Sequence, residues 1–168
     1  PAFEGRSISH GMRASKGAIE NVHIHPQTLE PMIVTVGNTN PRGICGSGLI
    51  ALISELLDAG VIDQAGAFTR SVQHPRIRAG TDGWEYVVVW GRDSLSGDDI
   101  TITEIDLDNL LRAKAAMFAG YQTLLASVGL SFADVQRVIL AGNFGAHIDV
   151  ERAIAIGLLP DLERERFF

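Results

Sequence analysis

The sequence of 168 residues contains a single cysteine, Cys45, and has no apolar run near the roughly 20 residues that a membrane-spanning helix needs. One cysteine cannot form an internal disulfide, and it cannot by itself build a thiolate metal site, which takes about four ligands. An excess of basic charge is also absent, because the formal net charge is -6 and the Lys and Arg residues are scattered. We therefore expect a cytoplasmic protein that binds neither nucleic acid nor membranes.

The composition is that of a folded domain, with 46% hydrophobic and 20% charged residues. A chain of this length can bury a sizeable core, so we predict a single domain over residues 1–168. The chain begins at Pro1 and ends in the letters ERERFF, which resemble the start of a strand. We expect it to be part of a longer protein.

Short segments rich in β-branched residues and bounded by Gly, Pro or Asn predict strands at 17–25, 31–37, 84–90 and 100–103. The segment 61–83 reads as a loop that ends in an Asp82-Gly83 turn. A buried strand is expected at 135–141, where it enters a glycine turn.

Helical spacing of apolar residues predicts three helices. The first contains Leu49 to Leu57 and ends near Gly60, and the longest runs over about 107–128, with Asp106 as its N-cap and Gly129 as its stop. A short last helix is capped by Asp149 and ends near Ile156. Strands punctuated by helices predict an α/β fold with a mixed sheet and flanking helices.

Ligands in such folds bind at the carboxyl ends of strands, where this sequence places two glycine-rich turns. The first turn, GICGSG, matches neither the Walker pattern nor the GxGxxG fingerprint. Because it precedes a helix, Gly46, Ser47 and Gly48 are candidate phosphate neighbours. The alternative, favoured by spacing alone, is that these glycines only let the helix pack closely.

Cys45 lies within this first turn. The five histidines are distant in sequence, so the sequence neither supports nor excludes a nucleophile-base pair. We favour a buried role as a small side chain.

The second turn follows the expected strand at 135–141 and contains Gly142, Asn143, Phe144 and Gly145. It combines backbone access, an amide that donates and accepts, and an aromatic face, which suits a nucleoside. An ordinary strand-to-helix connection with Phe144 in the core is the alternative, and His147 is expected in solvent.

One lysine interrupts the apolar stripe of the longest helix. Lys114 lies four residues after Leu110 and four before Phe118, so its ammonium must reach out to solvent, pair, or face a cleft. A position near a phosphate is the functional alternative to the commoner solvent-directed arrangement.

Four segments, in order, resemble the C-terminal ATPase domain of the reductive activators of corrinoid-dependent methyltransferases: PAFEGRSISHGMRASKGAIE, GICGSGLIALISELLDAGVID, LLRAKAAMFAG and VILAGNFGAHIDVERAIAIGLLP. This family belongs to the clan of actin, sugar kinases and heat-shock chaperones, so the resemblance implies an RNase H-like, actin-like ATPase lobe. Within the clan, GICGSGLI is similar to the second connecting motif and VILAGNFG to the adenosine motif.

The resemblance implies a function for the longer protein. Such activators use ATP, with Mg, to drive electrons from a 2Fe-2S domain to an inactive Co(II) corrinoid and restore Co(I). The implied partner is a corrinoid protein or a corrinoid-dependent methyltransferase. Assembly into a homodimer is a further expectation. By this resemblance, Gly142 to Gly145 would border adenosine, and Gly46 to Gly48 would lie at the hinge between lobes. Lys114 matches an Ala-Lys-Ala segment of the family, and Glu4 would reach the cleft.

The sequence also departs from the family. The Asp-Gly phosphate hairpins of the clan are not recognisable, because the only Asp-Gly pair, Asp82-Gly83, reads as a loop turn, and the cluster cysteines are missing. We therefore expect one truncated lobe that is inactive alone. Two alternatives remain open: an activator of a 2-hydroxyacyl-CoA dehydratase, which the lone Cys45 disfavours, and a docking or dimerisation module without enzymatic activity.

Overall fold

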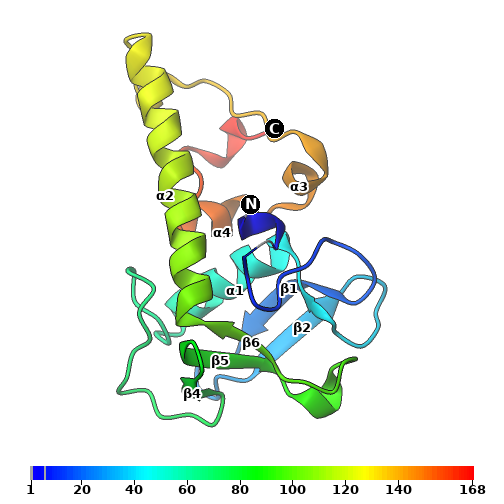
Figure 1. Ribbon diagram of the computed structural model, residues 1–168. Helices are drawn as coiled ribbons and strands as arrows, with labels where there is room; N and C mark the ends of the chain where they lie inside the picture. The colour runs from blue at the N-terminus through cyan, green and yellow to red at the C-terminus, as the bar shows by residue number, and fades with distance from the viewer. Residues whose placement is uncertain (1, 6) are drawn as a thin grey trace.

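The computed structural model covers residues 1–168 and describes all of them except Pro1 and Arg6. The side chains of Glu4, Asn143, Phe144 and Ala146 also lie outside the description. A mixed sheet forms its first layer (Figure 1). Strand β1 (Ala18–Ile24) pairs antiparallel with β2 (Pro31–Thr35) and parallel with the short β3 (Gly43–Ile44). The strands predicted at 17–25 and 31–37 are confirmed, as is the α/β class.

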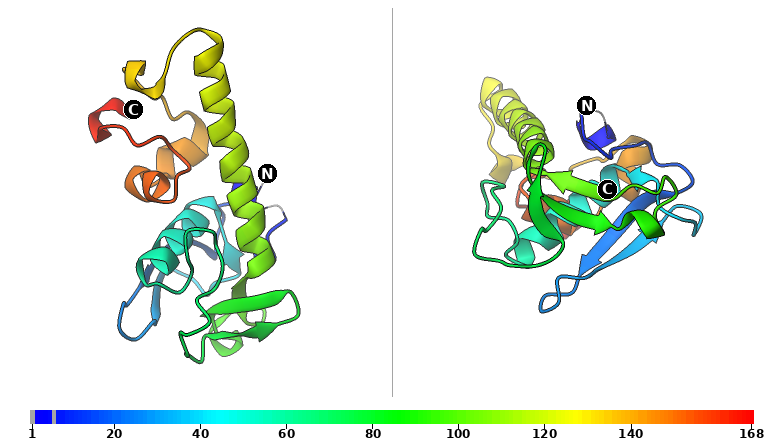
Figure 2. Two further views of the ribbon diagram at one scale, coloured as in Figure 1. Left: turned by 90° about the vertical axis from the view of Figure 1, so that its left-hand side faces the viewer. Right: turned by 60° about the horizontal axis from the view of Figure 1, so that its bottom comes forward.

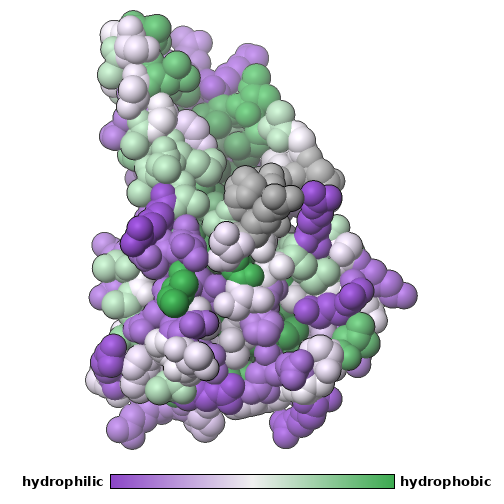
Figure 3. Space-filling view, in the orientation of Figure 1, coloured by the Kyte–Doolittle hydropathy of each residue, from purple (hydrophilic) through white to green (hydrophobic). Residues whose placement is uncertain are grey.

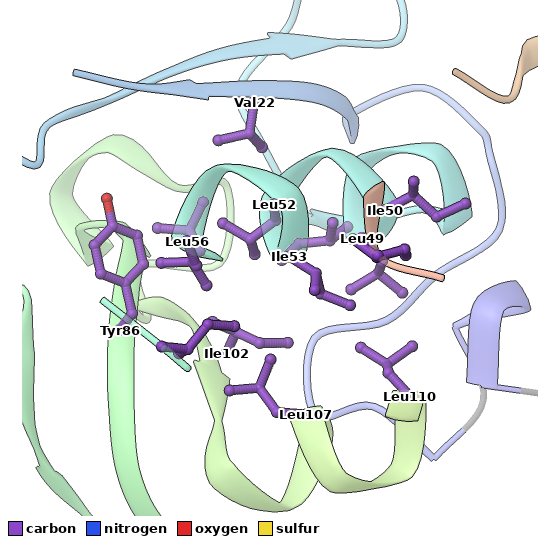
Figure 4. Packing of buried hydrophobic residues seen from close by; sticks show 14 of the residues in the cluster. Val22, Leu49, Ile50, Leu52, Ile53, Leu56, Tyr86, Ile102, Leu107 and Leu110 are labelled. Carbon is purple, nitrogen blue, oxygen red and sulfur yellow. The ribbon is translucent and has the colours of Figure 1, made fainter. Parts of the chain in front are cut away.

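Helix α1 (Gly46–Asp58) forms the centre of the core. Figure 4 shows Val22 of β1 on one side of this helix, and Tyr86, Ile102 and Leu107 on the other. Apolar residues around the helix are therefore buried, and those with at most 2% of their surface exposed are Leu49, Ile50, Leu52, Ile53 and Leu56. Gly60 ends the helical region with a φ of 67°, the left-handed conformation expected of a glycine stop.

A second, antiparallel sheet contains β4 (Ile77–Gly80), β5 (Gly83–Val89) and β6 (Ile100–Thr103), so the strands predicted at 84–90 and 100–103 are confirmed. The loop predicted over 61–83 is wrong at its end, because β4 pairs with β5 and Gly80 faces Gly83 across the turn. Asp82 therefore lies in the turn of a β-hairpin, and Gly83 is the first residue of its second strand. The sequence did not reveal β4 because its letters, IRAG, carry no alternating apolar pattern, and only Ile77 of this strand is buried.

The long helix α2 (Glu104–Ser127) begins earlier than predicted. Thr103 is its N-cap, and Asp106 is the third helical residue of a capping box rather than the cap itself. Asp106 is 1% exposed and also accepts hydrogen bonds from the backbone N–H and hydroxyl of Ser9, at 2.8 and 3.1 Å. Leu107 and Leu110 are buried, whereas the second half of α2 projects away from the two sheets (Figure 2).

The strand predicted at 135–141 is wrong within the described residues. This segment is extended but forms only one parallel bridge, Val138 with Phe167, and Ile139 is 76% exposed. A fully buried strand needs neighbours on both edges and both faces, whereas residues 166–168 pair with one edge of this segment and the described residues add no second strand on the other. Figure 3 shows hydrophobic surface gathered around the projecting half of α2, in contrast to the mixed surface below it.

Two short helices of the C-terminal region lie beside α1 (Figure 1). The segment predicted as a glycine turn forms helix α3 (Gly142–His147) instead. Helix α4 (Val150–Ala155) begins after two intervening residues. Asp149 caps α4 as predicted, since its carboxylate accepts from the N–H of Arg152 at 3.1 Å. Among the described residues, no helix is long and apolar enough to cross a bilayer.

Candidate functional site

A cavity of about 600 Å³ lies at the N-terminal end of α1. Gly46 and Ser47 of α1, Glu20 of β1, the loop residues 12–14 and His147 of α3 contribute to its lining. The first glycine-rich segment therefore lines this cavity, whereas α3 contributes His147, its last residue, and none of Gly142 to Gly145 is among the described lining residues.

The start of α1 offers backbone donors to this cavity. Cys45 is the N-cap, its side chain makes no capping hydrogen bond, and its carbonyl accepts from Leu49 at 2.8 Å. In the part of the chain that the structure describes, the N–H groups of Gly46, Ser47 and Gly48 have no backbone acceptor. Such a helix start attracts anions, and Arg13 at the lining adds positive charge, which Glu20 opposes.

Cys45 is buried, with 1% of its surface exposed. Its thiol lies 3.3 Å from the carbonyl oxygen of Ile19 and 3.4 Å from the hydroxyl of Ser47. Cys45 and His147 both line the cavity, but no histidine is among the hydrogen-bond partners of the thiol in the described residues. The predicted burial of Cys45 is confirmed.

Gly48 serves packing rather than the cavity. A Cβ built on Gly48 would overlap the carbonyl oxygen of Ile19 in β1, so only glycine lets α1 approach the sheet this closely. The packing alternative therefore describes Gly48, whereas Gly46 and Ser47 face the cavity.

The second glycine segment forms α3. Gly142 has a φ of 85°, a left-handed conformation that favours glycine. A Cβ on Gly145 would lie 2.7 Å from the carbonyl carbon of Leu140, so glycine lets the helix fold back on the preceding segment. The predictions for the side chains of Asn143, Phe144 and Glu4 lie outside the described residues. His147 is exposed, as expected.

Lys114 lies at a different place. It lines a second cavity of about 600 Å³ at the opposite end of α1, together with Ser54, Asp58 and Asp63. Its ammonium is 3.6 Å from the position of a Cβ built on Gly157, just beyond α4. The structure thus does not bring Lys114 to Gly46 and Ser47, and its contact with a nucleotide stays a prediction.

An ion-pair group that the sequence analysis missed joins α1, β1 and α4. Glu55 of α1 is 9% exposed and accepts from the guanidinium of Arg152 at 2.8 Å. Its other carboxylate oxygen accepts from the N–H of Ile24 at 2.7 Å and lies 2.9 Å from Nδ1 of His23. The available signal was the single acidic residue inside the apolar run LIALISELL.

A buried arginine, Arg76, stabilises the antiparallel sheet. Arg76 donates to Glu30 at 2.6 and 2.9 Å and to the carbonyl of Val87 at 2.8 Å. The hydrogen bonds from Arg76 lower the pKa of Glu30, against the opposing effect of burial. Neither residue lines the cavity at the start of α1.

Comparison with known proteins identifies the family. The chain is 35% identical over 170 residues to the corrinoid activation enzyme RamQ of Eubacterium limosum, covering 97% of this chain and 28% of the relative. It is 26% identical over 180 residues to a Co(II) methylated amine-specific corrinoid protein reductase of Methanosarcina barkeri, covering 95% of this chain and 29% of the relative.

A solved structure named reductive activator for corrinoid, iron-sulfur protein superposes with a TM-score of 0.94 and 51% sequence identity, over 99% of this chain and 27% of that chain. The chain therefore spans less than a third of the length of each of these proteins. The family model of the C-terminal domain of RACo, the ASKHA domain, matches residues 1–168, and the chain belongs to this family.

Proposed function

We propose that this chain is the ATP-binding part of a reductive activator that uses ATP to return an inactive Co(II) corrinoid protein to Co(I). The observation that carries the proposal is the family match over residues 1–168, together with relatives named for corrinoid activation and Co(II) corrinoid protein reduction. The partner is a corrinoid protein or a corrinoid-dependent methyltransferase. A cytoplasmic location and a homodimer remain predictions.

The cavity at the start of α1 is compatible with part of a nucleotide. Gly46 and Ser47 offer N–H donors suited to phosphate oxygens. We propose Gly142 to Gly145 for the adenosine side, because they begin α3, whose last residue, His147, lines the cavity. Magnesium bound with a nucleotide is usually held by the phosphates, waters and one or two carboxylates, and among the described residues Glu20 is the carboxylate that lines this cavity. We propose that the chain is one lobe of a larger ATPase and that other residues of the longer protein complete the site.

A 2Fe-2S cluster does not fit this chain. Such a cluster needs four ligands, usually cysteine thiolates, and the only cysteine is buried and hydrogen-bonded to a backbone carbonyl. In the proposed function the cluster belongs to another domain of the longer protein, and this chain contributes nucleotide binding.

The test uses the full-length protein that contains this chain, its corrinoid partner in the Co(II) state, and a chemical electron donor. We expect Co(I) to accumulate, as followed by its absorption spectrum, with ATP and not with a non-hydrolysable analogue. Equal reduction with and without ATP would contradict the proposal. ATP-dependent activation of a 2-hydroxyacyl-CoA dehydratase instead would support the alternative enzyme.

A further inference from the structure

Arg152 joins three elements through one guanidinium group. Its Nη1 donates to the side chain of Asn21 at 2.7 Å and to the carbonyl of Val22 at 3.1 Å, both in β1. Its Nη2 donates to Glu55 of α1 at 2.8 Å. The planar guanidinium is thus fixed by acceptors from two different elements, an arrangement that a lysine ammonium cannot reproduce.

The position of Arg152 in the chain connects this group to the candidate site. Arg152 lies in the first turn of α4, and only Ile148 and Asp149 separate α4 from α3. Glu55 lies on α1, whose first residues line the cavity, and His147 of α3 lines the same cavity. Arg152 itself does not line the cavity.

Apolar contacts hold α4 in place independently of this group, because Val150 and Ala153 are buried. Loss of the guanidinium contacts is therefore expected to shift α4 and α3 relative to α1 rather than to release them. A shift on the scale of an ångström is enough to weaken contacts made from both sides of a ligand.

We propose that Arg152 is a positioning residue for the nucleotide site, which acts by fixing α3 against the start of α1 through Glu55 and β1. This inference rests on the proposed function, because it requires that the cavity between α1 and α3 receives ATP.

The experiment compares ATP binding by full-length wild-type protein and its Arg152→Lys and Glu55→Gln variants, by calorimetric titration and by thermal unfolding. Lysine keeps the charge and glutamine keeps the size, so both variants are expected to fold. We expect ATP affinity to fall roughly 5- to 30-fold in each. In ATPase kinetics, KM is expected to rise with kcat little changed.

The matched control is Arg76→Lys, which removes another ion-paired guanidinium, one that is more buried than that of Arg152 and does not line the cavity. It is expected to lower the unfolding temperature at least as much as Arg152→Lys while leaving ATP affinity within about twofold, a change under about 0.5 kcal/mol. Unchanged affinity in Arg152→Lys, or equal losses in Arg152→Lys and Arg76→Lys, would overturn the inference. Wild-type protein without ATP affinity would overturn the proposed function itself, and this inference with it.

Discussion

Gly48 of α1 lies against the carbonyl oxygen of Ile19 in β1, with no room for a side chain between helix and strand. This contact sets the distance between α1 and the mixed sheet. It also places the first turn of α1 at the carboxyl end of β3, where the cavity opens.

We predict that Gly48→Ala destabilises the protein by about 1–3 kcal/mol, because the added methyl forces helix and strand apart. Gly120→Ala is the control, since Gly120 lies inside α2 with open space where a Cβ would stand. Alanine there should stabilise by about 0.5–1 kcal/mol. Urea unfolding of both variants measures the two effects, and a neutral Gly48→Ala would show that the contact relaxes freely.

Cys45→Ala is expected to leave ATP-dependent activation by the full-length protein largely intact, because the thiol is buried and has no basic partner among the described residues. A modest loss of stability is expected from the smaller side chain. Activity assays alongside thermal unfolding separate these effects. Complete loss of activity in a folded variant would show that the thiol takes part in the chemistry.

If α3 borders adenosine, Asn143→Ala should weaken ATP binding by the full-length protein by roughly 1–3 kcal/mol through a lost polar contact. Gly142→Val should weaken it further, because it adds bulk at a residue with a φ of 85°. Calorimetric titration measures both. Wild-type affinity in both variants would remove the nucleotide from this segment.

The Arg76–Glu30 pair predicts a dependence of stability on pH. Because the pKa of Glu30 is lowered in the folded protein, its contribution is present above the unfolded-state value near 4.5 and is lost as the pH falls through the folded-state value. Wild type should therefore exceed Glu30→Gln in stability at pH 7, and the difference should shrink below about pH 4.5. Urea unfolding from about pH 7 to about pH 3 tests this; a difference that grows in acid would contradict it.

The isolated chain is expected to fold, to bind ATP weakly or not at all, and to self-associate at high concentration. Ile139 and Phe168 are 76% and 65% exposed, and they flank the single bridge between Val138 and Phe167. Ile139→Lys should reduce the association in sedimentation experiments. ATP affinity equal to that of the full-length protein would show that these residues form a complete site.

Local patterns in the sequence were sufficient for β1, β2, β5, β6 and for helices α1, α2 and α4, because each carries its own apolar periodicity or cap, whereas α3 was expected as a turn. They failed where burial depends on partners. The segment 135–141 has the composition of a buried strand, yet Ile139 is exposed because the described chain offers no sheet around it. Strand β4 is the converse, since pairing with β5 creates a strand with a single buried residue.

The candidate site shows the same division. The glycine turns and Cys45 were visible in the sequence, and their resemblance to a family of activators was confirmed. The sequence did not show that Gly48 packs while Gly46 faces the cavity, that Lys114 lies at the far end of α1, or that Arg152 reaches Glu55 across 97 positions of the chain. Those facts depend on which elements meet in space, and close packing of α1 against β1 and α4 decided them.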